Sequence, residues 1–141
     1  MLEQDGKDEF LKISREMENL VNMYFVRQKH PTGFADAIMY ARAFTGDEPF
    51  AILLGDDVIY TDANTRPAIG QLMDCYSETG KPAVAVMEVP DADIPKYANI
   101  RGKEIGERRF AIDKIVEKPA VKDKFSNDAV IGRYVVEPDI Y

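Results

Sequence analysis

Several residue types that often carry chemistry are scarce in this sequence of 141 residues. It has one cysteine, Cys75, one histidine, His30, and no tryptophan. A single cysteine excludes an internal disulfide framework and is typical of a reducing compartment. One histidine and one cysteine cannot build a zinc cluster of the usual kind. Because Cys75 falls on a predicted helix, packing is a better interpretation of it than nucleophilic catalysis.

The sequence also lacks an apolar run of the roughly 20 residues that a membrane span needs, and residues 1–5 do not form a signal peptide. Lysine and arginine number 18 against 25 aspartates and glutamates, a net charge of -7. That balance disfavours nucleic acid and anionic membrane surfaces as partners. We therefore expect a cytoplasmic protein with no nucleic-acid or membrane partner, and the length predicts a single domain over residues 1–141.

The most informative stretch is FAILLGDD at residues 50–57. Its unbroken apolar run predicts a strand buried on both faces, at the centre of a parallel sheet. Asp56 and Asp57 then lie at the carboxyl end of the strand, where open α/β sheets bind their ligands. Adjacent carboxylates there suit a hard divalent cation with a phosphate on it, and the alternative is a solvated acidic turn.

The rest of the chain alternates predicted helices and strands as far as residue 90, and after that the predicted strands are joined by turns. Apolar residues at helical spacing predict helices over 8–21, about 35–43 and about 69–76. Apolar runs predict strands at 23–26, 50–54 and 83–89, which with the helices indicate a parallel βαβ sheet. Further strands near 97–100, 110–117 and 129–136 have only turns between them, so we expect an antiparallel, β-rich excursion after about residue 90.

Two more polar loops follow predicted strands. Gln28 has an amide that can donate and accept at a nucleobase edge, and Gly33 lets the backbone approach a flat ring. Glu117 could accept hydrogen bonds from hydroxyl groups, and Lys118 could bind a phosphate. The following residue, Pro119, restricts the backbone at this pair. A surface glutamine beside a turn glycine, and a surface ion pair, are the alternatives.

Taken together and in order, these segments resemble the bacterial-type UTP–glucose-1-phosphate uridylyltransferases, within the sugar nucleotidyltransferase family. The resemblance covers nearly the whole chain, and no single motif decides it. The segments that carry it are YFVRQK (24–29), PTGFADA (31–37), GDEPFAILLGDD (46–57), VEKP (116–119), SN (126–127) and IGRY (131–134).

The resemblance implies a Rossmann-like, three-layer α/β nucleotidyltransferase fold with a parallel or mixed sheet. It also implies that UTP and glucose 1-phosphate are joined to give UDP-glucose and pyrophosphate, with Mg²⁺. Carried over by position, Gln28 and Gly33 would contact the uracil, Asp56 would hold the metal, and Glu117 would bind sugar hydroxyls. Lys118 would meet the sugar phosphate, so Asp56 and Lys118 carry the catalytic roles.

Some of the family pattern is absent or altered. No glycine-rich triphosphate loop precedes Asp8, and the family's later metal-binding aspartate is missing, so we expect a central, incomplete part of the domain. Ala98 stands where relatives have a glycine beside the sugar, and Asp36 places a negative charge near the nucleotide. Without its first strand the sheet should expose an apolar edge, which favours pairing into a homo-oligomer.

Three hypotheses follow for the function of the chain. The first is a uridylyltransferase part with little activity alone, and the second is a non-catalytic nucleotide-binding or assembly module of the same fold. A phosphorelay receiver domain is the third, because it also combines acidic strand ends with a Lys-Pro pair. It fits less well, since the first predicted strand ends at Gln28 and not at an acidic pair.

Overall fold

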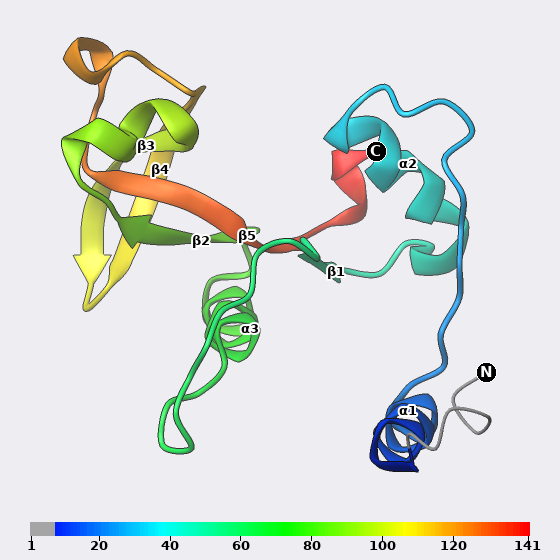
Figure 1. The fold of residues 1–141 in the computed structure, drawn as a ribbon. Coiled ribbons are helices and arrows are strands. Elements are labelled where there is room, and N and C mark those ends of the chain that lie inside the picture. The colour runs from blue at the N-terminus through cyan, green and yellow to red at the C-terminus, as the bar shows by residue number, and fades with distance from the viewer. Residues whose placement is uncertain (1–7) are drawn as a thin grey trace. The chain divides into compact units, whose positions relative to one another are not determined.

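The computed structural model describes residues 8–141, so the prediction that residues 1–5 form no signal peptide concerns a segment outside the described residues. The chain divides into two compact units, one up to Phe44 and one from Thr45 onward (Figure 1). Within the described range, no helix combines the length and the apolar content that crossing a bilayer requires.

The first unit contains two helices, α1 (Asp8–Leu20) and α2 (Phe34–Thr45), as the apolar spacing predicted. The stripe on α1 is exposed, with Phe10 at 64% and Met17 at 57% of full exposure. The predicted strand at 23–26 is wrong, because residues 22–28 join the helices without forming a strand. A strand needs a ladder partner, and the described residues of this unit supply only helices beside it.

The second unit carries the sheet. Its elements are β1 (Phe50–Leu53), α3 (Ala68–Thr79), β2 (Ala83–Glu88), β3 (Ala98–Gly106), β4 (Arg109–Glu117) and β5 (Asp128–Val136), with short 3₁₀ turns at Asp91–Lys96, Val121–Asp123 and Pro138–Ile140. Helix α3 ends at Gly80, whose left-handed φ of 61° lets its N–H close the last turn on the carbonyl of Tyr76.

Strand β5 is the centre of the sheet, and every pairing between the described strands is antiparallel. Because β1 and β2 both pair with residues 134–135 of β5, they lie on its opposite edges. Strands β2 and β3 both pair with Ala129 of β5, so they too lie on opposite edges of β5. Strand β3 is therefore on the same edge of β5 as β1. Strand β4 then pairs with β3 as a hairpin, which confirms the predicted antiparallel excursion after residue 90.

This arrangement corrects two predictions about β1. Strands β1 and β2 run in the same direction, but β5 lies between them, so they are not parallel neighbours. Strand β1 is also not buried on both faces, since Ala51 and Leu53 are exposed. An apolar run predicts a strand but not its partner, and here the partner comes from residues 133–136, far along the chain.

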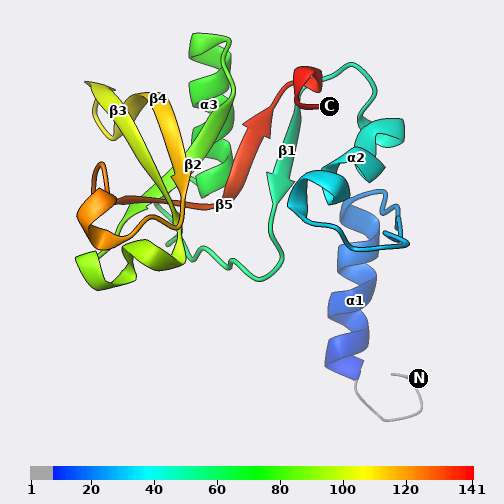
Figure 2. The same ribbon diagram turned by 90° about the horizontal axis from the view of Figure 1, so that it is seen from above.

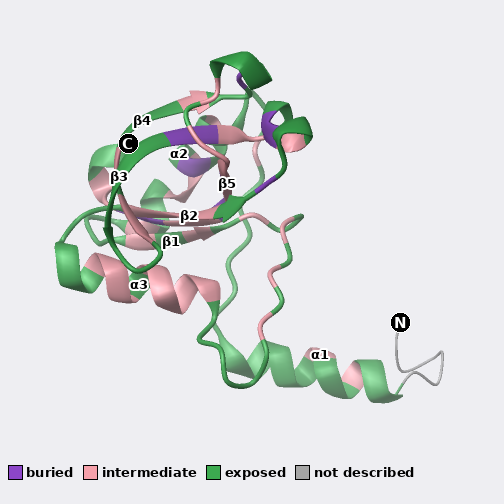
Figure 3. Cartoon of the chain, turned by 90° about the vertical axis from the view of Figure 1, so that its left-hand side faces the viewer, coloured by how far each residue is buried: buried purple, intermediate pink, exposed green. Residues whose placement is uncertain are grey.

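The core of this unit is small and lies where β2, β5 and the turn at Asp91–Lys96 meet. Ile94 and Ala129 are fully buried, Val89 is nearly so, and Tyr97 packs against them. Helix α3 packs against β2 and β5, beside the β3–β4 hairpin (Figure 2). The buried residues of the sheet and of the adjoining turn are purple in Figure 3.

Candidate functional site

The corner after β1, residues 54–57, is fixed to β5. The Leu54 N–H donates to the carbonyl of Gly132 at 3.0 Å, and the Gly132 N–H donates to Asp57 Oδ2 at 2.6 Å. The Arg133 guanidinium donates to the backbone carbonyls of Leu54, at 3.1 Å, and of Asp57. The Asp57 side chain thus faces the sheet, while Asp56 is exposed to solvent.

A second group of predicted site residues lies where β4 ends and β3 begins. Ala98 on β3 is paired with Glu117 on β4, and the Lys118 N–H donates to the Tyr97 carbonyl at 3.1 Å. Lys118 Nζ lies 3.7 Å from Glu117 Oε1, and both side chains are mostly exposed. Lys118 has a φ of 45°, in the left-handed region that residues with a Cβ avoid. Such backbone strain is found disproportionately at functional sites.

The strand register places these two groups along the same edge of β5, near the middle of that strand. Strand β1 pairs with residues 133–136 of β5, and β3 pairs with Ala129 on the same edge. The carboxyl end of β1 therefore points toward the amino end of β3, with only residues 130–132 of β5 between them. Asp56, Ala98, Glu117 and Lys118, which the sequence predicted as site residues, all follow or begin the strands that meet there.

Tyr134 on β5 reports the electrostatics of this region. Partial burial raises the pKa of the Tyr134 phenol above its ordinary value of 10.0, and the carboxylates of Glu117 and Asp57 raise it further. Carboxylates from both groups, one after β1 and one at the end of β4, therefore act on the pKa of a single phenol. It remains a protonated O–H at neutral pH.

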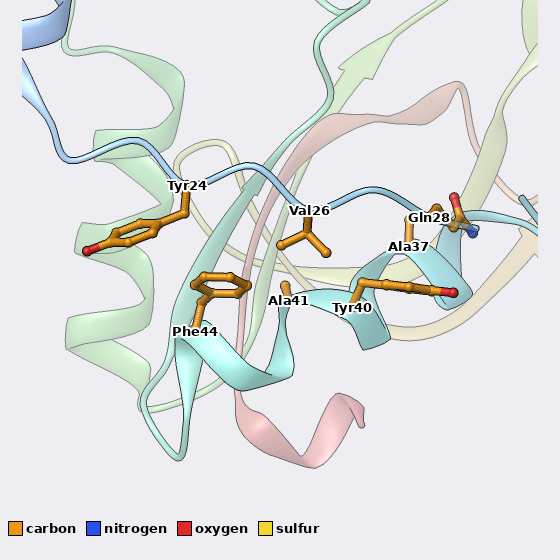
Figure 4. Close-up of a pocket in the computed structure, with 7 residues that line it drawn as sticks. All are labelled: Tyr24, Val26, Gln28, Ala37, Tyr40, Ala41 and Phe44. Carbon is orange, nitrogen blue, oxygen red and sulfur yellow. The ribbon is translucent and has the colours of Figure 1, made fainter. Parts of the chain in front are cut away.

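The first unit holds Gln28 and Gly33. The Gln28 amide nitrogen donates a hydrogen bond to the Asp36 carboxylate, the residue that departs from the family pattern. Gly33 has a φ of 129° and its carbonyl accepts from the Ala37 N–H at 3.2 Å, so it starts α2. Figure 4 shows a hollow of about 390 Å³ beside α2, lined by Tyr24, Val26, Gln28, Ala37, Tyr40, Ala41 and Phe44. Gln28 supplies the only side-chain amide in that lining.

Asp56 is an exposed carboxylate on the corner after β1 that could hold a divalent cation. Among residues 8–141 there is no cluster of three His, Cys, Asp or Glu side chains of the kind that holds a metal by protein ligands alone. Magnesium, however, is often bound by one or two carboxylates while substrate phosphates and water complete its shell. The carboxylate of Asp56 is exposed, so the donor set fits an ion delivered with a nucleotide phosphate.

The sequence did not reveal two residues that organise this region. Arg133 belongs to the IGRY segment that matched the family, but nothing in its sequence context showed that it bonds the β1 corner. Asn99 is buried, and its amide bonds the backbone of residues 125–128, which lie opposite β3. A polar residue inside an apolar strand pattern was the available signal for Asn99.

Comparison with known sequences matches residues 3–141 to the family described as nucleotidyl transferase. UTP–glucose-1-phosphate uridylyltransferase 1 of Staphylococcus saprophyticus is 43% identical over 141 residues, covering 100% of this chain and 48% of that protein. UTP–glucose-1-phosphate uridylyltransferase of Streptococcus pyogenes is 41% identical over 143 residues, covering 99% of this chain and 46% of that protein. The chain thus spans about half the length of these relatives.

Solved structures give the same result for the fold. UDP-glucose pyrophosphorylase complexed with UDP-glucose superimposes with a TM-score of 0.86 at 36% identity, over 95% of this chain and 51% of that one. The UTP-bound enzyme from Acinetobacter baumannii gives a TM-score of 0.76 at 29% identity, over 96% and 48% of the two chains. The helices and the antiparallel sheet described above therefore form part of an α/β nucleotidyltransferase fold, and the chain belongs to the nucleotidyl transferase family.

Proposed function

We propose that these residues carry part of the active site of a UTP–glucose-1-phosphate uridylyltransferase, which converts UTP and glucose 1-phosphate to UDP-glucose and pyrophosphate. The observation that supports this proposal is the register that places the Asp56 corner and Ala98, with Glu117 and Lys118 beside it, along one edge of β5. The relatives that share 41–43% identity with the chain are named for this reaction.

The proposed roles follow from the chemistry of each side chain. Glu117 accepts hydrogen bonds from the sugar hydroxyls, and the backbone at Ala98 lies beside the sugar. The Lys118 ammonium binds the phosphate of glucose 1-phosphate and holds the attacking oxygen in line with the α-phosphorus of UTP. Its positive charge also offsets the negative charge that develops on the phosphoryl oxygens. No covalent nucleophile is needed for this transfer.

Asp56 would hold the magnesium ion together with phosphate oxygens of the nucleotide. When bound, the ion supplies charge neutralisation at the transferring phosphoryl group. The position of Asp56 supports this role, because the backbone on either side of it is bonded to β5 and its own carboxylate is exposed. We propose Mg²⁺ in particular because carboxylate and phosphate oxygens are the ligands that it prefers.

On the nucleotide side, we propose that Gln28 and Gly33 contact the uracil. One N–H of the Gln28 amide is used by Asp36, which leaves the amide oxygen and the second N–H for the polar edge of a base. Because Asp36 fixes which end of the amide is used, the orientation of Gln28 is set before the base arrives.

The test is a titration of ¹⁵N-labelled protein with UDP-glucose and Mg²⁺, followed by amide NMR. We expect shifts at Ala98, Glu117 and Lys118, and a loss of these shifts in Glu117→Ala. Glu104→Ala, an exposed change farther along β3, is the control and should bind normally. Binding that leaves these amides unmoved would overturn the assignment. Pyrophosphate release by this chain alone should be low, since it spans about half of its relatives.

A non-catalytic assembly module is a second candidate, and β1 is the observation that favours it. Its only ladder partner among the described strands is β5, and Leu53 on it is 53% exposed. An apolar strand edge of this kind can pair with another chain. Light scattering over a range of concentrations separates the two candidates, because self-association without any response to UDP-glucose would favour the module.

A further inference from the structure

Two neighbouring aspartates in the β1 corner have opposite environments. Asp57 Oδ2 accepts the Gly132 N–H at 2.6 Å, and the Asp57 N–H donates to the Leu54 carbonyl at 3.3 Å. No hydrogen bond or ion pair from the described residues engages the Asp56 carboxylate, which is exposed. The tight turn at residues 54–57 therefore directs one carboxylate to β5 and leaves the other one free.

Arg133 completes the attachment of this corner. Its Nη1 donates to the Leu54 carbonyl at 3.1 Å and to the Gly132 carbonyl at 2.7 Å, and its Nη2 donates to the Asp57 carbonyl. A planar guanidinium can bridge several acceptors at once in a fixed geometry. The backbone before and after Asp56 is thus bonded to a single side chain of β5.

We propose that Asp57 and Arg133 are positioning residues, which hold the β1 corner on β5 so that Asp56 alone presents its carboxylate to the metal and its phosphate ligand. This inference rests on the proposed function, because it takes Asp56 as the metal ligand. Magnesium demands near-octahedral geometry, so a ligand on an unattached loop would bind it poorly. Outer partners that orient a metal ligand are worth about 10- to 100-fold in metal affinity.

Asp57 is a poor candidate for the ligand itself. Gly132 is buried, so its N–H would lose its acceptor if the Asp57 carboxylate turned toward a metal. Leaving a buried donor without a partner is costly. The Asp57 carboxylate therefore bonds the backbone of β5 and does not serve as a metal ligand.

The experiment uses Mn²⁺ together with UDP-glucose, whose phosphates complete the metal shell, and follows the paramagnetic broadening of amide signals at residues 55–57 in the full chain. Asp56→Asn should abolish this broadening. Asp57→Asn should keep it within about twofold of wild type, because the new amide oxygen can still accept from Gly132. Asp57→Ala and Arg133→Ala should weaken Mn²⁺ binding by about tenfold or more. Hydrogen exchange at Gly132 should stay slow in Asp57→Asn and become fast in Asp57→Ala.

A matched control separates positioning from a general loss of stability. Ile94→Val removes one carbon from the core of the same unit, destabilises the fold mildly, and should leave Mn²⁺ broadening unchanged. The inference is overturned if Asp57→Asn loses binding as Asp56→Asn does, or if Asp57→Ala binds like wild type. Wild-type protein without preferential broadening at 55–57 would instead overturn the metal role of Asp56, and the inference with it.

Discussion

Gly132 on β5 lies so close to Leu54 that a Cβ built on the glycine would be 2.7 Å from the Leu54 Cβ and 2.8 Å from Asp57 Oδ2. Carbon atoms do not approach one another that closely, so either the β1 corner or β5 must move to admit a methyl group. The close approach explains why a residue without a side chain occupies this position of β5, a strand that is otherwise rich in large apolar residues.

The first prediction follows directly from this contact. Gly132→Ala should destabilise the protein by about 1–3 kcal/mol, the usual cost of forcing extra volume into a packed site. Urea denaturation followed by circular dichroism measures the loss. Gly55→Ala is the matched control in the same corner, since its Cβ would meet nothing within 4 Å. That variant should be unchanged or more stable by up to about 1 kcal/mol, and equal stability of both variants would contradict the prediction.

A second prediction concerns Asn99, whose side chain is 1% exposed. Its Nδ2 donates to the carbonyls of Ser126 at 3.1 Å and Asp128 at 2.9 Å, and its Oδ1 accepts from the Phe125 N–H at 2.8 Å. Asn99→Ala should cost at least about 2 kcal/mol, because several buried groups lose their partner together.

Asn99→Asp tests the same contacts by pH. A carboxylate would face two carbonyl oxygens, so only the protonated acid suits the site and the folded-state pKa is raised above the unfolded value. Stability of this variant should be highest at low pH and fall as the pH rises through the raised pKa. Denaturation midpoints over a pH series measure this, with wild type as the control. A variant whose stability rises with pH would contradict the assigned bonding of Asn99.

The helices and the β3–β4 hairpin could be predicted because their signals are local. Apolar spacing predicted α1 and α2 in nearly their observed positions, and Gly80 marked the end of α3. The partner of β1 could not be predicted, because its apolar residues fit any neighbour and β5 lies about 80 residues away. The same holds for the candidate site. The residue types Asp and Lys suggested Asp56 and Lys118 from the sequence, whereas the contact of Arg133 with the β1 corner joins residues far apart in the chain and could not be predicted.

The strained backbone of Lys118 gives the third prediction. A φ of 45° disfavours any residue with a Cβ, so Lys118→Gly should raise stability by about 1 kcal/mol while removing the ammonium group. Binding of glucose 1-phosphate, measured by ligand-detected NMR, should weaken at the same time. Arg108→Gly is the matched control, because Arg108 has a φ of 56° in the β3–β4 turn and no proposed role. It should gain stability and keep binding. Equal binding by both variants would remove Lys118 from the site.

Acid stability should depend on Asp91, which is the fourth prediction. Its hydrogen bond to the Lys124 ammonium, followed by that to Asn127, lowers the pKa of the Asp91 carboxyl below 3.8. A lowered pKa contributes stability that is present above the unfolded value and lost as the pH falls through the folded one. Asp91→Asn should therefore lose less stability than wild type between about pH 6 and about pH 2. Asp139→Asn, an exposed change near the last turn, is the control and should follow wild type. Identical acid curves for Asp91→Asn and wild type would contradict this account.

The last prediction concerns Asp36, whose carboxylate accepts a hydrogen bond from the Gln28 amide. In Asp36→Asn the new amide oxygen can still accept from the Gln28 amide, so the orientation of Gln28 is kept while one negative charge is removed. If Gln28 contacts uracil, the triphosphate of UTP binds near this charge. Affinity for UTP should then rise by about two- to fivefold, the scale of one screened surface charge, and the gain should shrink as salt is added.

Isothermal titration with UTP at low and high salt measures this gain. Asp36→Ala should bind less well than Asp36→Asn, because it removes the charge and also leaves the Gln28 amide unfixed. Asp47→Asn, an exposed change of the same charge before β1, is the control for a general effect of net charge. An equal gain in Asp47→Asn would assign the effect to the overall charge of -7 and not to the bond between Asp36 and Gln28.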